Sequence, residues 1–172
     1  MEDIFIYLFN IENKTDYNNT LIKLACQYAK ENGISFEDNT ILRTDKNKPY
    51  FKGNPFHFSV SHSKEVLGIA FSKYPLGLDI QDHRNCKKEK IAKKFFHPDE
   101  IAHLNSENFF KIWTAKESYV KFKGNGIDKT FREFSVFDNI ENYNFSEFEH
   151  HTLCVYSERK VKLHLQTSKN IV

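Results

Sequence analysis

The chain has 172 residues, 40% of them hydrophobic and 28% charged, with a net charge of +2. This composition is typical of one soluble domain or of two small fused units, and a charge so near neutrality argues against binding nucleic acid or a membrane through bulk charge. The three cysteines are far apart in the chain and lack zinc spacing, which indicates a reducing compartment. The sequence shows neither a signal peptide nor a membrane-length apolar run, so we predict a cytoplasmic location.

The first half of the chain is dominated by predicted strands. A helix is expected from Asp16 or Asn18 to Gly33, because apolar residues recur at helical spacing between them. The strands are expected at 4–9, 41–43, 56–61, 66–72 and 76–81. The last three are separated by short turns and predict an antiparallel meander.

The second half changes from helices back to strands. Helices are expected over 86–96, from Pro98 onward, and over 109–122 with Gly124 at the end. Alternating apolar residues predict strands at 131–137, 152–156 and 161–166. Strands, then helices, then strands again indicate an α+β fold with antiparallel pairing. Neither a Walker loop nor a dinucleotide-binding glycine motif is found.

The helix at 109–122 is apolar on most of its surface, yet it carries Glu117 and Lys121 one turn apart. A carboxylate beside a buried surface requires a partner, because an unpaired buried charge costs roughly several kcal/mol. Lys121 or Lys116 can supply that partner, and a metal ion that bridges to a second molecule is the alternative.

Two further places combine polar and apolar residues. Strand periodicity puts Gly77, Asp79 and Gln81 on one face of the strand at 76–81, and His62 lies at the end of the strand before a turn. Each has an ordinary structural explanation, as an edge-strand aspartate or a turn histidine. Taken together, two carboxylates, a histidine and lysines favour magnesium and a phosphorylated substrate.

These residues resemble the signature of the 4'-phosphopantetheinyl transferases. The segment Gly77-Leu78-Asp79 is followed, 38 residues after Asp79, by Glu117 within the specific block W-T-A-K-E-S-Y-V-K, which spans 113–121. Weaker elements of the same pattern are Lys48-Pro49, Ser61-His62-Ser63 and the F-x-x-x-E stretch that ends at Glu100. The matches extend from about residue 48 to 126.

The resemblance is strongest to the Sfp-type branch of that family and implies its fold. We expect a monomer that forms a pseudo-dimer of two similar α+β halves with antiparallel sheets. The expected halves are residues 1–80 and residues 81–172, the second of which carries the W-T-A-K-E-S-Y-V-K helix.

The resemblance also implies the reaction. Coenzyme A would donate its 4'-phosphopantetheine group to a serine of an apo acyl or peptidyl carrier protein, with Mg²⁺ required and 3',5'-ADP released. Asp79, Glu117 and Gln81 are the expected metal ligands, and Lys48, Ser61, His62, Lys116 and Lys121 the expected coenzyme A contacts. Catalysis is assigned to Glu117, Lys121, His62 and Glu100, with the base left open between Glu117, Glu100 and a bound water.

Two departures from the family pattern bear on activity. Many Sfp-type members have an acidic residue where this chain has Gln81, and an arginine for the coenzyme A 3'-phosphate where it has Asn19-Thr20. Lys14, Lys23 or Arg43 can replace that arginine. The alternative function is therefore a catalytically degenerate module that binds coenzyme A or a carrier protein. The lysines at 87–94 form either a solvated helix face or a contact for an acidic carrier.

Overall fold

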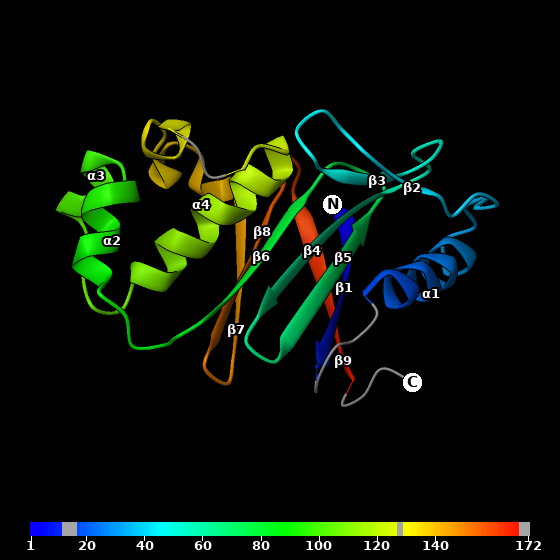
Figure 1. The fold of residues 1–172 in the computed structure, drawn as a ribbon, viewed down its shortest axis with the longest axis horizontal. Helices are drawn as coiled ribbons and strands as arrows, with labels where there is room; N and C mark the ends of the chain where they lie inside the picture. The colour runs from blue at the N-terminus through cyan, green and yellow to red at the C-terminus, as the bar shows by residue number, and fades with distance from the viewer. Residues whose placement is uncertain (12–16, 127–128, 169–172) are drawn as a thin grey trace.

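A computed structural model of the chain describes residues 1–11, 17–126 and 129–168 (Figure 1). The strands are β1 Glu2–Asn10, β2 Ile41–Arg43, β3 Pro49–Phe51, β4 His57–Ser63, β5 Val66–Ser72, β6 Gly77–Asp82, β7 Tyr143–Phe148, β8 His151–Tyr156 and β9 Val161–Ser168. The α-helices are α1 Tyr17–Glu31, α2 Lys88–Phe95, α3 Pro98–Ala102 and α4 Phe109–Lys123, and the 3₁₀ helices are η1 Lys129–Arg132 and η2 Val136–Asn142. The α+β fold class is confirmed.

The first sheet has the strand order β4-β5-β1-β9. Strands β4, β5 and β1 pair antiparallel, whereas β9, near the end of the chain, lies parallel to β1. Residues of β1 alternate between the two faces, as strand geometry requires. Tyr7 and Phe9 pack with Tyr28 of α1, which covers one face of this sheet (Figure 1).

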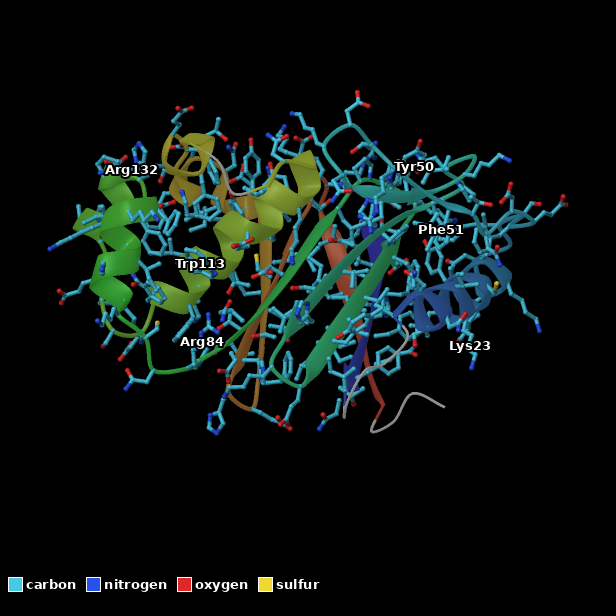
Figure 2. The ribbon with its side chains drawn as sticks, in the orientation of Figure 1. Lys23, Tyr50, Phe51, Arg84, Trp113 and Arg132 are labelled. Carbon is cyan, nitrogen blue, oxygen red and sulfur yellow. The ribbon has the colours of Figure 1, made fainter. Side chains whose placement is uncertain are left out.

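The second sheet has the order β6-β8-β7, with antiparallel pairing throughout. Helix α4 crosses one face of this sheet, and α2 and α3 lie beyond it (Figure 1). Trp113 of α4 packs between Phe95 and Phe131, with ring centroids 5.7 and 5.6 Å away, and so joins α4 to the outer helices (Figure 2).

The remaining faces of the two sheets pack against each other. Ile4, Ile6 and Leu8 of β1 meet Leu78 and Ile80 of β6 in one buried cluster. The order of layers is therefore helix, sheet, sheet, helix. Asp79 lies on β6, where this strand passes between β4 and α4.

Three serines of β4 join the two sheets. Strand β6 is at the edge of its sheet, so alternate backbone N–H groups need other acceptors. The hydroxyls of Ser59, Ser61 and Ser63 accept from Leu78 N, Ile80 N and Asp82 N at 2.9, 3.1 and 2.8 Å. We call this row of hydrogen bonds the serine seam. It replaces the backbone ladder that would otherwise join β4 to β6.

Two predicted features are wrong. The expected meander ends at β5, because β6 pairs with β8 rather than with β5. The strand expected at 131–137 is replaced by parts of η1 and η2, since Phe131 and Phe134 lie three residues apart and pack on the same helical cluster. Strands β3 and β7 were not predicted.

The division at residue 80 remains a prediction. That residue lies within β6, and β9 returns the chain to the sheet of the first half. Asp16 and Lys14 fall outside the described residues. Across the described part of the chain, the structure contains no helix long and apolar enough to span a membrane.

Candidate active site

Asp79 lies in the middle of β6 and faces α4. Gly77 explains how the helix comes so close to this strand: a Cβ atom there would collide with the carbonyl oxygen of Ser118 and lie 2.5 Å from Phe122 N. Asp79 itself is only 6% exposed. Burial raises the pKa of its carboxyl group, while Lys121 and Ser61 act in the opposite direction.

One oxygen of Asp79 is held by two neighbours. Its Oδ1 accepts from Lys121 Nζ at 2.8 Å and from Ser61 Oγ at 2.9 Å, and the same Lys121 Nζ lies 2.8 Å from Ser61 Oγ. Three elements, β4, β6 and α4, therefore meet at this carboxylate. Ser61 belongs both to this group and to the serine seam, and so orients Asp79 directly.

Glu117 lies one turn before Lys121 on α4 but is not its partner. In the part of the chain that the structure describes, its carboxylate makes neither a hydrogen bond nor an ion pair, since Lys121 pairs with Asp79 instead. Burial, and then the neighbouring charge of Asp79, raise the pKa of Glu117 to about 7. At neutral pH this group can therefore both hold and release a proton.

The two carboxylates fit a magnesium ion. Among the described residues, Asp79 Oδ2 is buried without a hydrogen-bond partner, and the neighbouring Glu117 carboxylate has none either. Magnesium commonly uses one or two carboxylates and completes its shell with water and substrate phosphates. The described residues contain no group of three or more acidic, histidine or cysteine side chains that could hold a metal ion.

Gln81 shares the strand face of Asp79, but its amide is turned away. Its Nε2 donates to the backbone oxygen of Asp82 at 3.4 Å. Gln81, the third expected ligand, is therefore close to Asp79 in the strand, but its amide nitrogen is hydrogen-bonded elsewhere.

A cationic cavity of about 230 Å³ begins at Lys121. Lys46 and Lys48 also line it, together with the glycine-rich segment after α4, and no acidic side chain does. Gly124 ends the helix with a left-handed φ of 72°, and a Cβ atom there would lie 3.1 Å from Lys48 Cδ. Clustered lysines of this kind suit phosphate oxygens.

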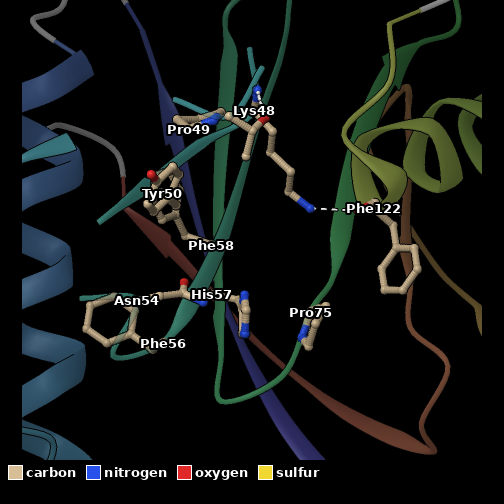
Figure 3. Close-up of a pocket in the computed structure, with 10 residues that line it drawn as sticks. Lys48, Pro49, Tyr50, Asn54, Phe56, His57, Phe58, Pro75 and Phe122 are labelled. Carbon is tan, nitrogen blue, oxygen red and sulfur yellow. Dashed lines mark hydrogen bonds between the residues drawn. The ribbon is translucent and has the colours of Figure 1, made fainter. Parts of the chain in front are cut away.

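Lys48 also lines a larger cavity of about 390 Å³ (Figure 3). Its Nζ donates to the carbonyl oxygen of Phe122 at 2.8 Å, and His57 and Pro75 lie on the opposite side (Figure 3). Burial lowers the pKa of Lys48 to about 8. The predicted nucleotide contact is thus a desolvated cation without a carboxylate partner, beside two cavities.

His62 points to the other face of β4. It is exposed and lines a cavity of about 310 Å³ that Arg43 and Tyr17 also line. The structure therefore does not bring His62 to Asp79, but it does bring it to Arg43, one of the three residues that could replace the missing arginine. Lys14, another of them, lies outside the described residues.

Glu100 and Lys116 are not part of the carboxylate group around Asp79. Both side chains are completely buried, and they pair with each other, with Lys116 Nζ 3.0 Å from Glu100 Oε2. Burial lowers the pKa of Lys116, and the charge of Glu100 opposes that shift. A base and a coenzyme A contact need access to the substrate, so we leave these two residues out of the proposed site.

The sequence reasoning missed Lys46 as a lining residue, and Ser59 and Ser63 as members of the seam. The serines did leave a signal, since they recur at every second position of one strand. Nothing comparable marks Lys46, because its position depends on how the β2–β3 hairpin folds over β4.

Comparisons with known proteins identify the family of the chain. Residues 75–168 match the model of the 4'-phosphopantetheinyl transferase superfamily. A 4'-phosphopantetheinyl transferase of Bacillus subtilis is 30% identical over 135 residues, which are 72% of this chain and 60% of that protein. The 4'-phosphopantetheinyl transferase gsp of Aneurinibacillus migulanus is 34% identical over 109 residues, 59% of this chain and 46% of that protein.

A third relative is the 4'-phosphopantetheinyl transferase Sfp of Bacillus subtilis strain 168, 34% identical over 87 residues, 46% of this chain and 38% of that protein. The chain thus spans about half the length of the curated relatives it matches. The family model covers more than half of the chain and includes both Asp79 and the helix with Glu117. The chain therefore belongs to the 4'-phosphopantetheinyl transferase superfamily.

Proposed function

We propose that this protein transfers 4'-phosphopantetheine from coenzyme A to a serine of an apo carrier protein in a Mg²⁺-dependent reaction. The observation that carries the proposal is the pair of carboxylates: Asp79 has a buried, unpartnered oxygen, and Glu117 beside it has a pKa near 7. In a purely structural cluster, each carboxylate would be expected to have a hydrogen-bond or ion-pair partner. Two carboxylates with free oxygens beside a lysine-lined cavity suit a metal ion that binds a pyrophosphate.

The residues divide into three roles. Asp79 and Glu117 would hold magnesium, which neutralises charge on the pyrophosphate when it is bound. Lys121 and Lys48, which both line the cavity, would bind the phosphates. His62 and Arg43 share a cavity without an acidic lining residue and would bind a phosphate further along the donor, so that Arg43 replaces the absent arginine.

The reaction forms one bond and breaks one. The serine oxygen of the carrier attacks the pyrophosphate phosphorus that bears the pantetheine arm, and the bond from that phosphorus to the bridging oxygen breaks. The serine proton passes to Glu117, since a carboxylate can bind a metal through one oxygen and accept a proton with the other. The 3',5'-ADP leaves with the negative charge, which Lys121 and Lys48 stabilise.

The test is intact-mass spectrometry of an apo acyl carrier protein incubated with the protein, coenzyme A and magnesium. We expect the carrier to gain one phosphopantetheine, and expect Asp79→Ala or chelation of the metal to abolish the gain. Glu37→Ala is the matched control, because Glu37 is an exposed carboxylate that is not among the residues lining the three cavities described above. Transfer that persists in Asp79→Ala would contradict the assigned role of the carboxylates.

A second candidate function is a module that binds coenzyme A or a carrier without catalysis. The orientation of Gln81 favours it, because its amide is engaged with Asp82 and brings no charge to the carboxylates. Coenzyme A binding without transfer to any of several carriers would support this alternative. Gln81→Glu would then be the next variant to measure.

A further inference from the structure

A buried ion pair lies on α4 immediately before Glu117 and outside the proposed mechanism. Lys116 and Glu100 are both completely buried, and Lys116 Nζ lies 3.0 and 3.1 Å from the two oxygens of Glu100. Buried ion pairs contribute little net stability, because desolvation offsets their attraction, and their best-attested role is to select one arrangement of packed elements.

The pair connects three segments around α4. Glu100 accepts from His97 N at the start of α3 and from Val136 N at the start of η2, both at 2.8 Å. Lys116 also donates to Phe134 O at 2.7 Å, and its Nζ lies 4.0 Å from the centre of the Phe134 ring. Both charged groups therefore have partners from elements that surround the helix.

Helix α4 needs such a constraint, because its apolar residues do not define a single side. Its buried residues are Phe109, Phe110, Ile112, Thr114, Ala115, Lys116, Ser118 and Val120. A helix that is buried on most sides has no single apolar stripe to define its orientation. A directional polar contact on one side can supply that orientation.

The rotation of α4 decides where the proposed catalytic residues point. Consecutive residues of an α-helix differ by about 100°, and residues four apart share a side. Lys116 therefore determines the direction of Glu117, the next residue, and of Lys121, one turn further. Lys121 must reach Asp79 Oδ1, which it does at 2.8 Å.

We propose that the Glu100–Lys116 pair is a positioning device, which sets the rotation of α4 and so holds Glu117 and Lys121 against Asp79. The catalytic roles of Glu117 and Lys121 in this inference rest on the proposed function. The orienting effect itself is argued from the contacts of the pair. It gives Glu100 and Lys116 a role that needs no contact with substrate.

The test replaces the pair by a neutral one of similar shape, Glu100→Gln with Lys116→Met, so that neither charge is left buried alone. Mn²⁺ affinity is measured by electron paramagnetic resonance without coenzyme A or carrier, and kcat and KM are measured separately. We expect about tenfold weaker Mn²⁺ binding and a lower kcat with a smaller change in KM for coenzyme A. Lys116→Arg with Glu100 unchanged keeps both charges, and it should retain most of the wild-type Mn²⁺ affinity and kcat.

Tyr28→Leu is the control for lost stability, because Tyr28 is a residue of α1 that is buried in the core between α1 and the first sheet, a different cluster from that of α4. If the neutral pair lowers the melting temperature as Tyr28→Leu does, and leaves Mn²⁺ affinity and kcat unchanged, the pair is only structural and the inference is wrong. Wild-type protein that binds no Mn²⁺ would overturn it too, since no site would then exist to be positioned. Mn²⁺ binding without transfer would count against the proposed function alone.

Discussion

The raised pKa of Glu117 suits proton transfer at neutral pH, but it also lowers the stability of the folded protein. Its pKa is raised from 4.5 to about 7 by burial and by Asp79. Between these two values the unfolded chain has lost the proton while the folded protein retains it. The free energy of unfolding contributed by this residue therefore falls as pH rises from about 4.5 to 7, and stays low above that.

We accordingly predict that Glu117→Gln stabilises the protein at pH 8. The expected gain is about 1–3 kcal/mol, from about 1.4 kcal/mol per unit of pKa shift, discounted because the side chain is partly exposed. At pH 4.5 the variant and the wild type should be nearly equal. Urea unfolding at the two pH values measures this difference.

Glu107→Gln is the matched control for Glu117→Gln, because Glu107 is exposed and lies just before the same helix. A stability gain of equal size in both variants would show that the effect comes from net charge. The prediction requires a gain at Glu117 alone, which disappears in acid.

The sequence predicted the identity of the site residues better than their partners. Asp79 and Glu117 were recognised from their types and spacing, and the structure brings them near each other. The pairing of Lys121 with Asp79, and of Lys116 with Glu100, could not be read from the chain. Adjacent helix residues suggested local pairs, but these contacts join residues 42 and 16 positions apart and depend on the packing of α4.

At the level of elements, the serine seam takes the place of a strand ladder. Two sheets meet edge to edge at β4 and β6, and alternate serine hydroxyls accept the backbone N–H groups of the facing strand. Removing one hydroxyl leaves a buried donor without an acceptor, and the cost of such a donor is about 1–3 kcal/mol.

We predict that Ser59→Ala and Ser63→Ala each lower the free energy of unfolding by about 1–3 kcal/mol. Ser61 is not used for this test, because it also contacts Asp79. Chemical unfolding followed by circular dichroism gives the measurement. Ser106→Ala is the control at an exposed position and should change stability by less than about 0.5 kcal/mol.

The exposed lysines of α2 provide a second prediction at this scale. Lys87, Lys90 and Lys93 follow closely after β6, which carries Asp79, and have no ion-pair partner in the described part of the chain. If the carrier presents an acidic surface, changing these three to alanine should raise KM for the carrier about tenfold at low salt and leave kcat unchanged.

The comparison variant carries alanine at Lys73, Lys160 and Lys162, which are exposed lysines elsewhere on the chain. It has the same net charge as the α2 variant. An equal rise of KM in both would mean that overall charge, rather than the α2 surface, attracts the carrier, and a KM that does not depend on salt would rule out both explanations.

Element types were predictable where periodicity was strong, as in α1 and β4, and not where tertiary contacts decide. β6 follows β5 after a short turn, so a meander was the natural expectation. In the structure it leaves the first sheet and pairs with β8, more than seventy residues later, because its apolar face covers the first sheet and its other face must meet α4.

Over the whole molecule, one buried histidine lies in β8, the central strand of the second sheet. His151 is 7% exposed, both of its ring nitrogens lack hydrogen-bond partners among the described residues, and its ring stacks on Phe148. Burial lowers its pKa. The charged or titratable groups around it are Asp82, Glu149, Lys64 and His83.

We predict that His151 makes the fold sensitive to mild acid. As pH falls below about 6.5, the unfolded state binds a proton at this residue and the folded state resists it, so the free energy of unfolding falls. His151→Phe should flatten that decline, whereas His150→Phe, at the exposed neighbouring position, should not. Melting temperatures between pH 5 and 8 measure the slopes, and parallel slopes in all three proteins would contradict the prediction.

The position of β9 has a consequence for synthesis. Strand β1 leaves the ribosome well before its parallel neighbour, which spans residues 161–168. One side of β1 therefore stays without its backbone partner until nearly the whole described chain has been made. Pairing of such distant segments is slow and leaves an open strand edge that invites association with other chains. We expect nascent chains halted near residue 150 to be bound by chaperones, and those that extend past residue 168 to be released.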